Sequence, residues 1–315
     1  MIYLQLIGGL VMLFVAGDVL VRGAVGVAER LGIPPLIIGL TVVAFGTSAP
    51  ELVISLEAAL SGSGGIAVGN IVGSNIANVL LVLGMPALIA TTDCSKSGCE
   101  KMFGFMLMVT ALFVVMLFTG PLGLFHGVVL LGLLVFYLLW NIHSARSGHG
   151  GGDELDEVGD IPQSLTLVIV LLVIGLVGLP LGAKLTIDAA VHVARLWGVS
   201  ETAIGLTVVA LGTSLPELAT SLMAAIRKHA AVAIGNVIGS NVFNILAIIG
   251  TTAVVIPVPV PAEILSFDIW VMVATTLLLV PFVFACRPIG RRTGSLFVGA
   301  YILYIALVYW FGTSA

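Results

Sequence analysis

Residues 39–52 read GLTVVAFGTSAPEL, and residues 205–218 read GLTVVALGTSLPEL. The two segments differ only at position 45 versus 211 and at position 49 versus 215, and they lie 166 residues apart. The same offset continues without a gap, because GNIVGSNIANVL at 69–80 aligns with GNVIGSNVFNIL at 235–246. A repeat of this length indicates that the chain consists of two related halves.

The composition of the whole chain is that of a membrane protein. Of its 315 residues, 59% are hydrophobic and 9% are charged, and the mean hydropathy is +1.22. A soluble domain carries roughly 25% charged residues, so this chain lacks the polar surface of a water-soluble fold. We predict an all-α polytopic membrane protein with ten transmembrane helices. Their approximate ranges are 2–29, 35–60, 66–90, 103–119, 121–143, 162–195, 201–226, 230–256, 267–286 and 294–312.

The basic residues orient these spans. Of the twelve Lys and Arg residues, only Lys184 and Arg195 fall on one side of the membrane, and the other ten fall on the opposite side. The positive-inside rule makes the rich side cytosolic and places both termini outside a cytoplasmic (inner) membrane. We therefore predict a first five-helix repeat at 1–143, an acidic cytosolic linker at 144–161, and a second repeat at 162–315.

The two repeats are expected to be inverted relative to each other. Five spans separate each repeated segment from its copy, and an odd number of spans reverses the orientation. Inverted repeats are typical of secondary transporters, whose binding site lies near the midplane where the halves meet.

The chemistry of the repeated segments is unusual for a membrane interior. Each places a Gly, two hydroxyls, a Pro and a carboxylate in mid-span, at Gly46 to Glu51 and at Gly212 to Glu217. Because Pro lacks an N–H, we expect each helix to break there and to free backbone carbonyls. A new half-helix then begins beside the carboxylate. Carbonyls, hydroxyls and carboxylates are hard oxygen ligands suited to Na⁺ and Ca²⁺.

A capping box is the structural alternative for these segments. Ser48 with Glu51, and Ser214 with Glu217, have the spacing of a box that satisfies the start of a helix. Two intramembrane glutamates at repeat-related positions favour the functional interpretation, because each charge is expensive in lipid. Two carboxylates would also balance one Ca²⁺.

The second pair of repeated segments offers further oxygen ligands. Ser74 and Asn78 are four residues apart on one helix face, and Ser240 and Asn244 repeat this spacing. We interpret these four residues as ligands, since amide oxygens complete cation shells. Four other asparagines are interpreted as hydrogen-bonding residues between helices: Asn70, Asn75, Asn236 and Asn241.

Three acidic residues do not share this repeat symmetry. Asp18 and Asp188 lie near span ends without a matched acidic residue, so we interpret them as interfacial. Glu57 aligns with Met223 and is interpreted as a packing or mouth residue.

The paired motifs resemble the α-repeats of the Na⁺/Ca²⁺ exchanger family, within the cation/Ca²⁺ exchanger superfamily and its ten-span prokaryotic branch. The resemblance covers essentially the whole chain. It implies an electrogenic antiporter that exchanges three Na⁺ for one Ca²⁺. The family's ligand positions fall here on Ala44, Thr47, Ser48, Glu51, Ser74 and Asn78 in the first half. In the second half they fall on Ala210, Thr213, Ser214, Glu217, Ser240 and Asn244. Ala44 and Ala210 would contribute only backbone carbonyls.

One departure from the family bears on the coupling ion. Several members, including K⁺-dependent ones, carry Asp at the position of Asn244, whereas both halves of this chain have Asn. This difference weakens the case for K⁺ cotransport. H⁺/Ca²⁺ exchangers of the superfamily typically show G-N-x-x-E in the broken helix, where this chain has GTSxPE. A proton-driven antiporter for Ca²⁺ or another divalent cation is therefore the alternative.

Other classes fit the sequence less well. A nucleic-acid partner is not expected without a basic patch, and nothing indicates an obligate protein partner or a cofactor. An enzyme is not expected, because the five His residues form no catalytic set. A channel would require rapid release, which deep charged sites hinder. Cys94, Cys99 and Cys286 are interpreted as reduced thiols on the cytosolic side.

The long first and sixth spans lack the ligand motifs and are rich in glycine. Their glycines lie at 8, 9, 17, 23 and 26, and at 175, 178 and 182. We expect these small residues to form a smooth face on which the two spans slide together over the ligand-bearing helices. Such sliding would open the site to one side at a time.

Overall fold

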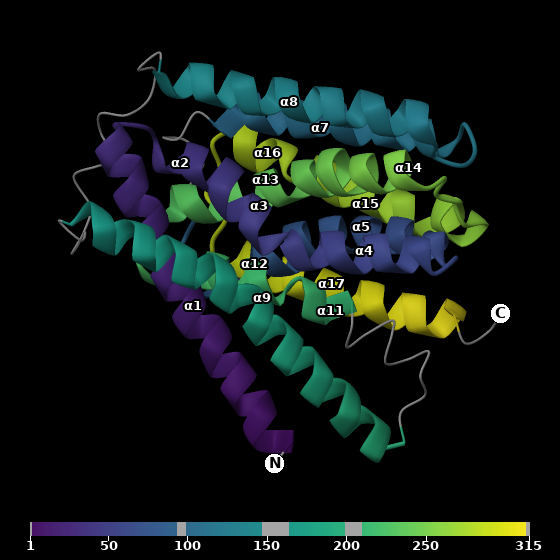
Figure 1. The fold of residues 1–315 in the computed structure, drawn as a ribbon, viewed down its shortest axis with the longest axis horizontal. Coiled ribbons are helices and arrows are strands. Elements are labelled where there is room, and N and C mark those ends of the chain that lie inside the picture. The colour runs from purple at the N-terminus through teal and green to yellow at the C-terminus, as the bar shows by residue number, and fades with distance from the viewer. Residues whose placement is uncertain (1, 93–98, 147–163, 199–209, 313–315) are drawn as a thin grey trace.

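The computed structural model describes residues 2–92, 99–146, 164–198 and 210–312. These residues form helices joined by short connections (Figure 1). The first half comprises α1 (Ile2–Leu31), α2 (Pro35–Ile38), η1 (Gly39–Val43), α3 (Ala44–Thr47), α4 (Ala49–Leu60), α5 (Gly64–Ala77), η2 (Asn78–Val82), α6 (Gly84–Ile89), α7 (Cys99–Leu117) and α8 (Leu124–Arg146).

The second half is described from residue 164, without residues 199–209. It comprises α9 (Leu165–Leu196), α11 (Ala210–Thr213), α12 (Leu215–Ile226), α13 (Ala230–Phe243), η5 (Asn244–Ile249), α14 (Gly250–Val255), η6 (Ile264–Asp268), α15 (Ile269–Leu278), α16 (Val280–Phe284) and α17 (Arg291–Gly312). The elements labelled η are π-helices.

The membrane spans agree with the predicted all-α fold. Eight helices in the described residues are long and apolar enough to cross a bilayer. The bent pair Pro35–Thr47 and Ala49–Leu60 meets the same criteria when its two helices are taken as one broken span, and Leu215–Ile226 is a shorter apolar helix. The predicted start of the seventh span, 201–209, lies outside the described residues, as do Cys94 and most of the predicted linker.

Burial separates the helices into central and peripheral groups. The spans Gly64–Ile89 and Ala230–Val255, which carry the GNxxGSNxxN segments, are the most deeply buried. Large apolar side chains of peripheral helices, including Phe125 and Leu296, face outward, as expected for surfaces that contact lipid. The repeated motifs therefore occupy the centre of the molecule.

The long helices α1 and α9 cross each other on one side of the bundle, oblique to its helices (Figure 1). Glycines form this crossing: a Cβ on Gly23 would lie 2.6 Å from the Leu172 nitrogen, and one on Gly175 would lie 2.6 Å from Leu20 Cα. The same holds for Gly9, Gly26, Gly178 and Gly182. The expectation that the glycines of these spans form the sliding face was therefore wrong for these six, because they pack α1 against α9. Gly17 packs instead against α12.

Two isolated antiparallel β-bridges, here called backbone clips, join the halves at repeat-related places. Leu122 and Val258 exchange N–H to carbonyl bonds of 2.9 and 2.8 Å, and Thr92 and Ile289 exchange bonds of 3.0 and 2.8 Å. Thr92 and Val258 are separated by the repeat offset of 166 residues. The inverted symmetry thus extends to the connections.

Candidate functional site

The two repeated motifs form helix breaks that place a carboxylate in the first turn of a new helix. The breaks fall at Ser48 (φ −83°, ψ 6°) and Ser214 (φ −85°, ψ 3°), and the first one bends the span by 42°. Each Pro lies in the first turn of the new helix, where its missing N–H costs no hydrogen bond. The sequence predicted a break at each Pro, and the structure places it two residues earlier, because the Pro is accommodated in the first turn of the new helix. Glu51 and Glu217 follow in these first turns.

Both carboxylates are buried where the halves meet. Glu51 and Glu217 are each 1% exposed. Ser48 Oγ donates a 2.9 Å hydrogen bond across the halves to Glu217 Oε1, and Ser240 Oγ lies 3.5 Å from the same oxygen. Thr47 Oγ1 lies 3.5 Å from Ser240 Oγ. Residues from both repeats therefore share one polar centre.

The capping-box alternative is contradicted by these contacts. Neither Ser48 nor Ser214 makes a side-chain hydrogen bond to the helix that it begins. Ser48 instead bonds the glutamate of the other half, and Ser214 Oγ is buried without a partner. Helix capping does not explain why these serines occur in mid-span.

Most buried oxygens that lack a hydrogen-bond partner belong to the predicted ligand set. In the described part of the chain, eight buried side-chain polar atoms have no partner, and six of them are predicted ligands. The six are Glu51 Oε2, Ser74 Oγ, Asn78 Oδ1, Ser214 Oγ, Glu217 Oε2 and Asn244 Oδ1. An unsatisfied buried oxygen costs about 1–3 kcal/mol, and a bound cation would remove that cost.

Crossed asparagine pairs orient two of these oxygens. Asn78 Nδ2 donates to Asn241 Oδ1 at 3.0 Å, and Asn244 Nδ2 donates to Asn75 Oδ1 at 3.0 Å. Because the amide nitrogens are held between the helices, the oxygens of Asn78 and Asn244 remain available as acceptors. Asn75 and Asn241 thus make the interhelical bonds that the sequence predicted.

Asn70 and Asn236 also make the predicted bonds between helices, and they do so symmetrically. Asn70 Nδ2 donates to Ser55 Oγ at 3.0 Å and approaches the Glu51 carbonyl at 3.5 Å. Asn236 Nδ2 donates to Ser221 Oγ at 3.0 Å and to the Glu217 carbonyl at 3.2 Å. These bonds fix the helix turn that carries each glutamate. Ser55 and Ser221 were missed, although each recurs four residues after its glutamate.

The π-helices are a second feature that the sequence analysis missed. In both central spans the helix changes from α to π at the asparagine predicted as a ligand, Asn78 in η2 and Asn244 in η5. Such single-turn widenings frequently occur at functional sites. Both π-helices begin at repeat-related asparagines, but the residues around them give no local signal for the widening.

The remaining predicted ligands lie beside this centre. Thr47, Thr213 and Ala44 are fully buried. The Ala44 carbonyl accepts the Ser48 N–H at 3.0 Å, and Thr47 Oγ1 approaches it at 3.3 Å. Ala210 begins the described helix α11.

The residues interpreted as peripheral behave differently from one another. Glu57 and Asp188 are exposed. Asp18 is not merely interfacial, because it forms ion pairs with Arg22 and Arg227. The acidic groups of the described chain form no cluster of three or more metal-binding side chains. The candidate site is therefore built mainly from neutral oxygens around two carboxylates.

Known proteins match this chain over nearly its whole length. A profile of the family described as "Sodium/calcium exchanger protein" matches residues 1–143 and 167–310. The inner membrane protein YrbG of Escherichia coli is 35% identical over 97% of this chain and 96% of its own length. The sodium/calcium exchanger MaX1 of Methanosarcina acetivorans is 31% identical over 98% of both chains.

A solved structure agrees with the fold. The sodium-calcium exchanger NCX_Mj, soaked with 2.5 mM Na⁺ and 0.1 mM Ca²⁺, superposes with a TM-score of 0.83. Its sequence is 35% identical, and the match covers 96% of each chain.

Inverted repeats, broken helices and a buried oxygen-lined centre define a multi-pass membrane exchanger of cations, and not an enzyme. This class exchanges a cation for Ca²⁺. The chain belongs to the sodium/calcium exchanger family.

Proposed function

We propose that the protein exchanges Na⁺ for Ca²⁺ by alternating access, electrogenically, with three Na⁺ moving against one Ca²⁺. The observation that supports this proposal is the convergence of unpartnered oxygens from both halves on two buried carboxylates. Two carboxylates neutralise one Ca²⁺, and bidentate binding by both would supply four of its 6–8 ligands. The neutral oxygens around them suit Na⁺.

The proposed ligands are the twelve residues of the paired motifs. They are Ala44, Thr47, Ser48, Glu51, Ser74, Asn78, Ala210, Thr213, Ser214, Glu217, Ser240 and Asn244. Because the glutamates are shared, Na⁺ and Ca²⁺ exclude each other, which makes them cross the membrane in alternation. Relatives named as sodium/calcium exchangers favour Na⁺ as the coupling ion. The excess of basic residues favours a location in the cytoplasmic membrane with both termini outside.

Uptake of ⁴⁵Ca²⁺ into proteoliposomes tests the coupling ion. We expect uptake when the vesicles are loaded with Na⁺ and diluted into Na⁺-free buffer, with no requirement for K⁺. Two asparagines, Asn78 and Asn244, motivate the K⁺ independence. Uptake driven by a pH gradient without Na⁺ would assign the protein to the H⁺/Ca²⁺ exchangers instead.

The same vesicles test the stoichiometry. Exchange of three Na⁺ for one Ca²⁺ moves one net charge, so a K⁺ ionophore that dissipates the membrane potential should accelerate uptake. Electroneutral exchange would be insensitive to the ionophore. Vesicles that contain the Glu51→Gln variant provide the background.

A further inference from the structure

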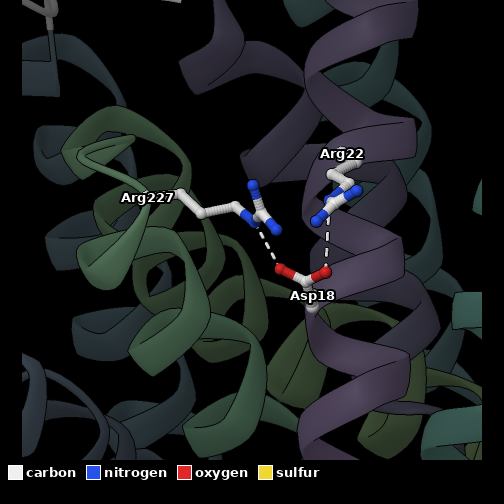
Figure 2. A network of polar contacts seen from close by, with 3 residues as sticks. All are labelled: Asp18, Arg22 and Arg227. Atoms are coloured by element: carbon white, nitrogen blue, oxygen red, sulfur yellow. Dashed lines mark hydrogen bonds and ion pairs between the residues drawn. The ribbon is translucent and has the colours of Figure 1, made fainter. Parts of the chain in front are cut away.

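Helix α1 packs closely along α12, the helix that carries Glu217. A Cβ on Gly17 would lie 3.1 Å from the Ala219 carbonyl oxygen and 3.3 Å from the Thr220 nitrogen. One residue further, Asp18 forms an ion pair with Arg227, which ends α12 (Figure 2). The pair therefore joins a long peripheral helix to the end of a ligand-bearing helix.

The repeat-related helices in the other half are arranged differently. Helix α9 is the repeat mate of α1, and α4 is the repeat mate of α12, yet α9 and α4 make no more than marginal contact. The two halves thus adopt different conformations. Since the repeats are inverted, the end of α12 and the end of α4 lie on opposite faces of the membrane.

The repeat-related positions in the other half do not carry the charges of this ion pair. At the offset of 166 residues, Asp18 corresponds to Lys184 and Arg227 corresponds to Ser61. The Ser61 hydroxyl donates a 2.7 Å bond to the Glu57 carbonyl of its own helix. When the halves exchange conformations, as alternating access requires, Lys184 approaches Ser61, a neutral hydroxyl at the position of Arg227. The opposite state therefore has no ion pair between these two equivalent positions; Glu57, one turn before Ser61, corresponds to Met223 and has no counterpart in the latch.

We propose that Asp18 and Arg227 form a latch on one face only, which favours the state in which α1 covers α12 and closes the path on that face. The proposal rests on the exchange function proposed above. The charge bias predicts that the latched face is cytosolic, because Arg22 and Arg227 belong to the basic side.

Arg22 makes the latch reversible. It lies one turn after Asp18 on the same helix and contacts the other carboxylate oxygen at 3.1 Å (Figure 2). When α1 leaves α12, Asp18 retains this partner and is not left as a bare charge. Burial, followed by the Arg227 charge, lowers the pKa of the neighbouring His229 side chain and so disfavours a further positive charge beside the latch.

The expected strength of the latch is modest. The side chains of Asp18, Arg227 and Arg22 are 20%, 29% and 44% exposed, so solvent screens the pairs. Partly exposed ion pairs of this kind change an equilibrium by about two- to five-fold. A bias of this size tunes the two states without locking either of them.

Half-saturating Ca²⁺ concentrations, measured from each face in membrane vesicles of each sidedness, test the latch. Asp18→Asn, Arg227→Gln and the double variant should all lower the half-saturating concentration at the latched face by about two- to five-fold. The value at the opposite face should stay constant or rise. The change in half-saturating concentration should be no larger in the double variant than in either single variant, because all three lose the same interaction. Arg22→Gln should act in the reverse direction and raise the half-saturating concentration at the latched face, because Asp18 would then have no partner once α1 leaves α12.

Ser61 supplies an independent test without touching the latch. Ser61→Asp places a carboxylate opposite Lys184 in the other state. It should change the half-saturating Ca²⁺ concentrations at the two faces in the same directions as Asp18→Asn does. Ser61→Lys places like charges together and should change these concentrations in the reverse directions. Equal shifts of the same sign at both faces, or no shift in any variant, would overturn the latch. Loss of exchange in the unmodified protein would instead refute the proposed function.

Discussion

At the residue scale, the site is a balance between two charges and many neutral oxygens. Glu51 and Glu217 are the glutamates that both recur in the repeat and lie buried at the centre. Burial of a carboxylate in a membrane is unfavourable unless ligands or bound cations compensate it. The two glutamates are therefore expected to control ion binding more strongly than any neutral neighbour.

Removing one of these charges should abolish transport without unfolding the protein. We expect Glu51→Gln and Glu217→Gln to reduce ⁴⁵Ca²⁺ uptake to background, because one carboxylate cannot balance a divalent ion. The folded variants should still reach the membrane, since glutamine keeps the shape and costs less in lipid than a charge. The exposed Glu57 of the same helix provides the control, and Glu57→Gln should retain uptake. Normal uptake in either site variant would exclude that glutamate from the site.

Ser214 distinguishes ion binding from helix capping. Loss of a capping hydroxyl destabilises a protein by about 0.5–2 kcal/mol. Because Ser214 makes no capping bond, Ser214→Ala should leave thermal stability nearly unchanged in ion-free buffer. The same variant should weaken Na⁺ or Ca²⁺ binding, which isothermal titration can measure. A large loss of stability with unchanged binding would support a structural role for the hydroxyl.

Much of this site could be predicted from the sequence, since the repeat singled out Glu51, Glu217 and their hydroxyl neighbours. The partner of each hydroxyl could not be predicted. Ser48 has the spacing of a local cap, and only the approach of the other half shows that it bonds Glu217. Side-chain bonds between distant segments depend on tertiary packing, which a local motif does not encode.

At the scale of elements, close backbone packing holds the broken span against α13. A Cβ on Gly235 would lie 2.6 Å from the Leu36 carbonyl oxygen, and one on Gly239 would lie 2.7 Å from the Leu40 carbonyl oxygen. The four-residue spacing of Gly235 and Gly239 is typical of close helix packing, although the equivalent Gly69 and Gly73 make no such close contact. The sequence does not predict the π-helices η2 and η5, because the widening depends on the tertiary bonds that Asn78 and Asn244 make.

Substitution of one packing glycine should test this contact. We expect Gly235→Ala to destabilise the protein by about 1–3 kcal/mol, because the backbone of η1 or α2 must move to admit the methyl group. Gly132→Ala on α8 is the matched control, since its Cβ would meet no atom within 4 Å among the described residues. Thermal unfolding in detergent would measure the difference. Equal stability of the two variants would show that the central helices yield easily at this point.

At the scale of the whole molecule, the two halves share a fold but differ in how a long helix packs on them. Helix α1 packs along α12, whereas the repeat-related helices α9 and α4 make no more than marginal contact. The repeat predicted their inverted relation and could not predict this difference, because equivalent segments carry nearly the same residues. The glycines of α1 and α9 illustrate the limit. Their number suggested a smooth face, but the identity of the facing helix decides whether a glycine permits sliding or fixes a pair. Here six of them fix the pair, so α1 and α9 are expected to move as one body.

The crossed asparagine pairs and the two backbone clips hold the two halves of the chain together without a covalent link. Asn78 with Asn241, Asn75 with Asn244, and the Leu122–Val258 clip each connect one half to the other. The polar centre thus depends on contacts between halves more than on the peptide that links them. Co-expression of fragments 1–150 and 151–315 should therefore restore exchange by fragment complementation. The fragments should purify together and take up ⁴⁵Ca²⁺, whereas either fragment alone should be degraded or inactive, as its half of the asparagine pairs would lack partners.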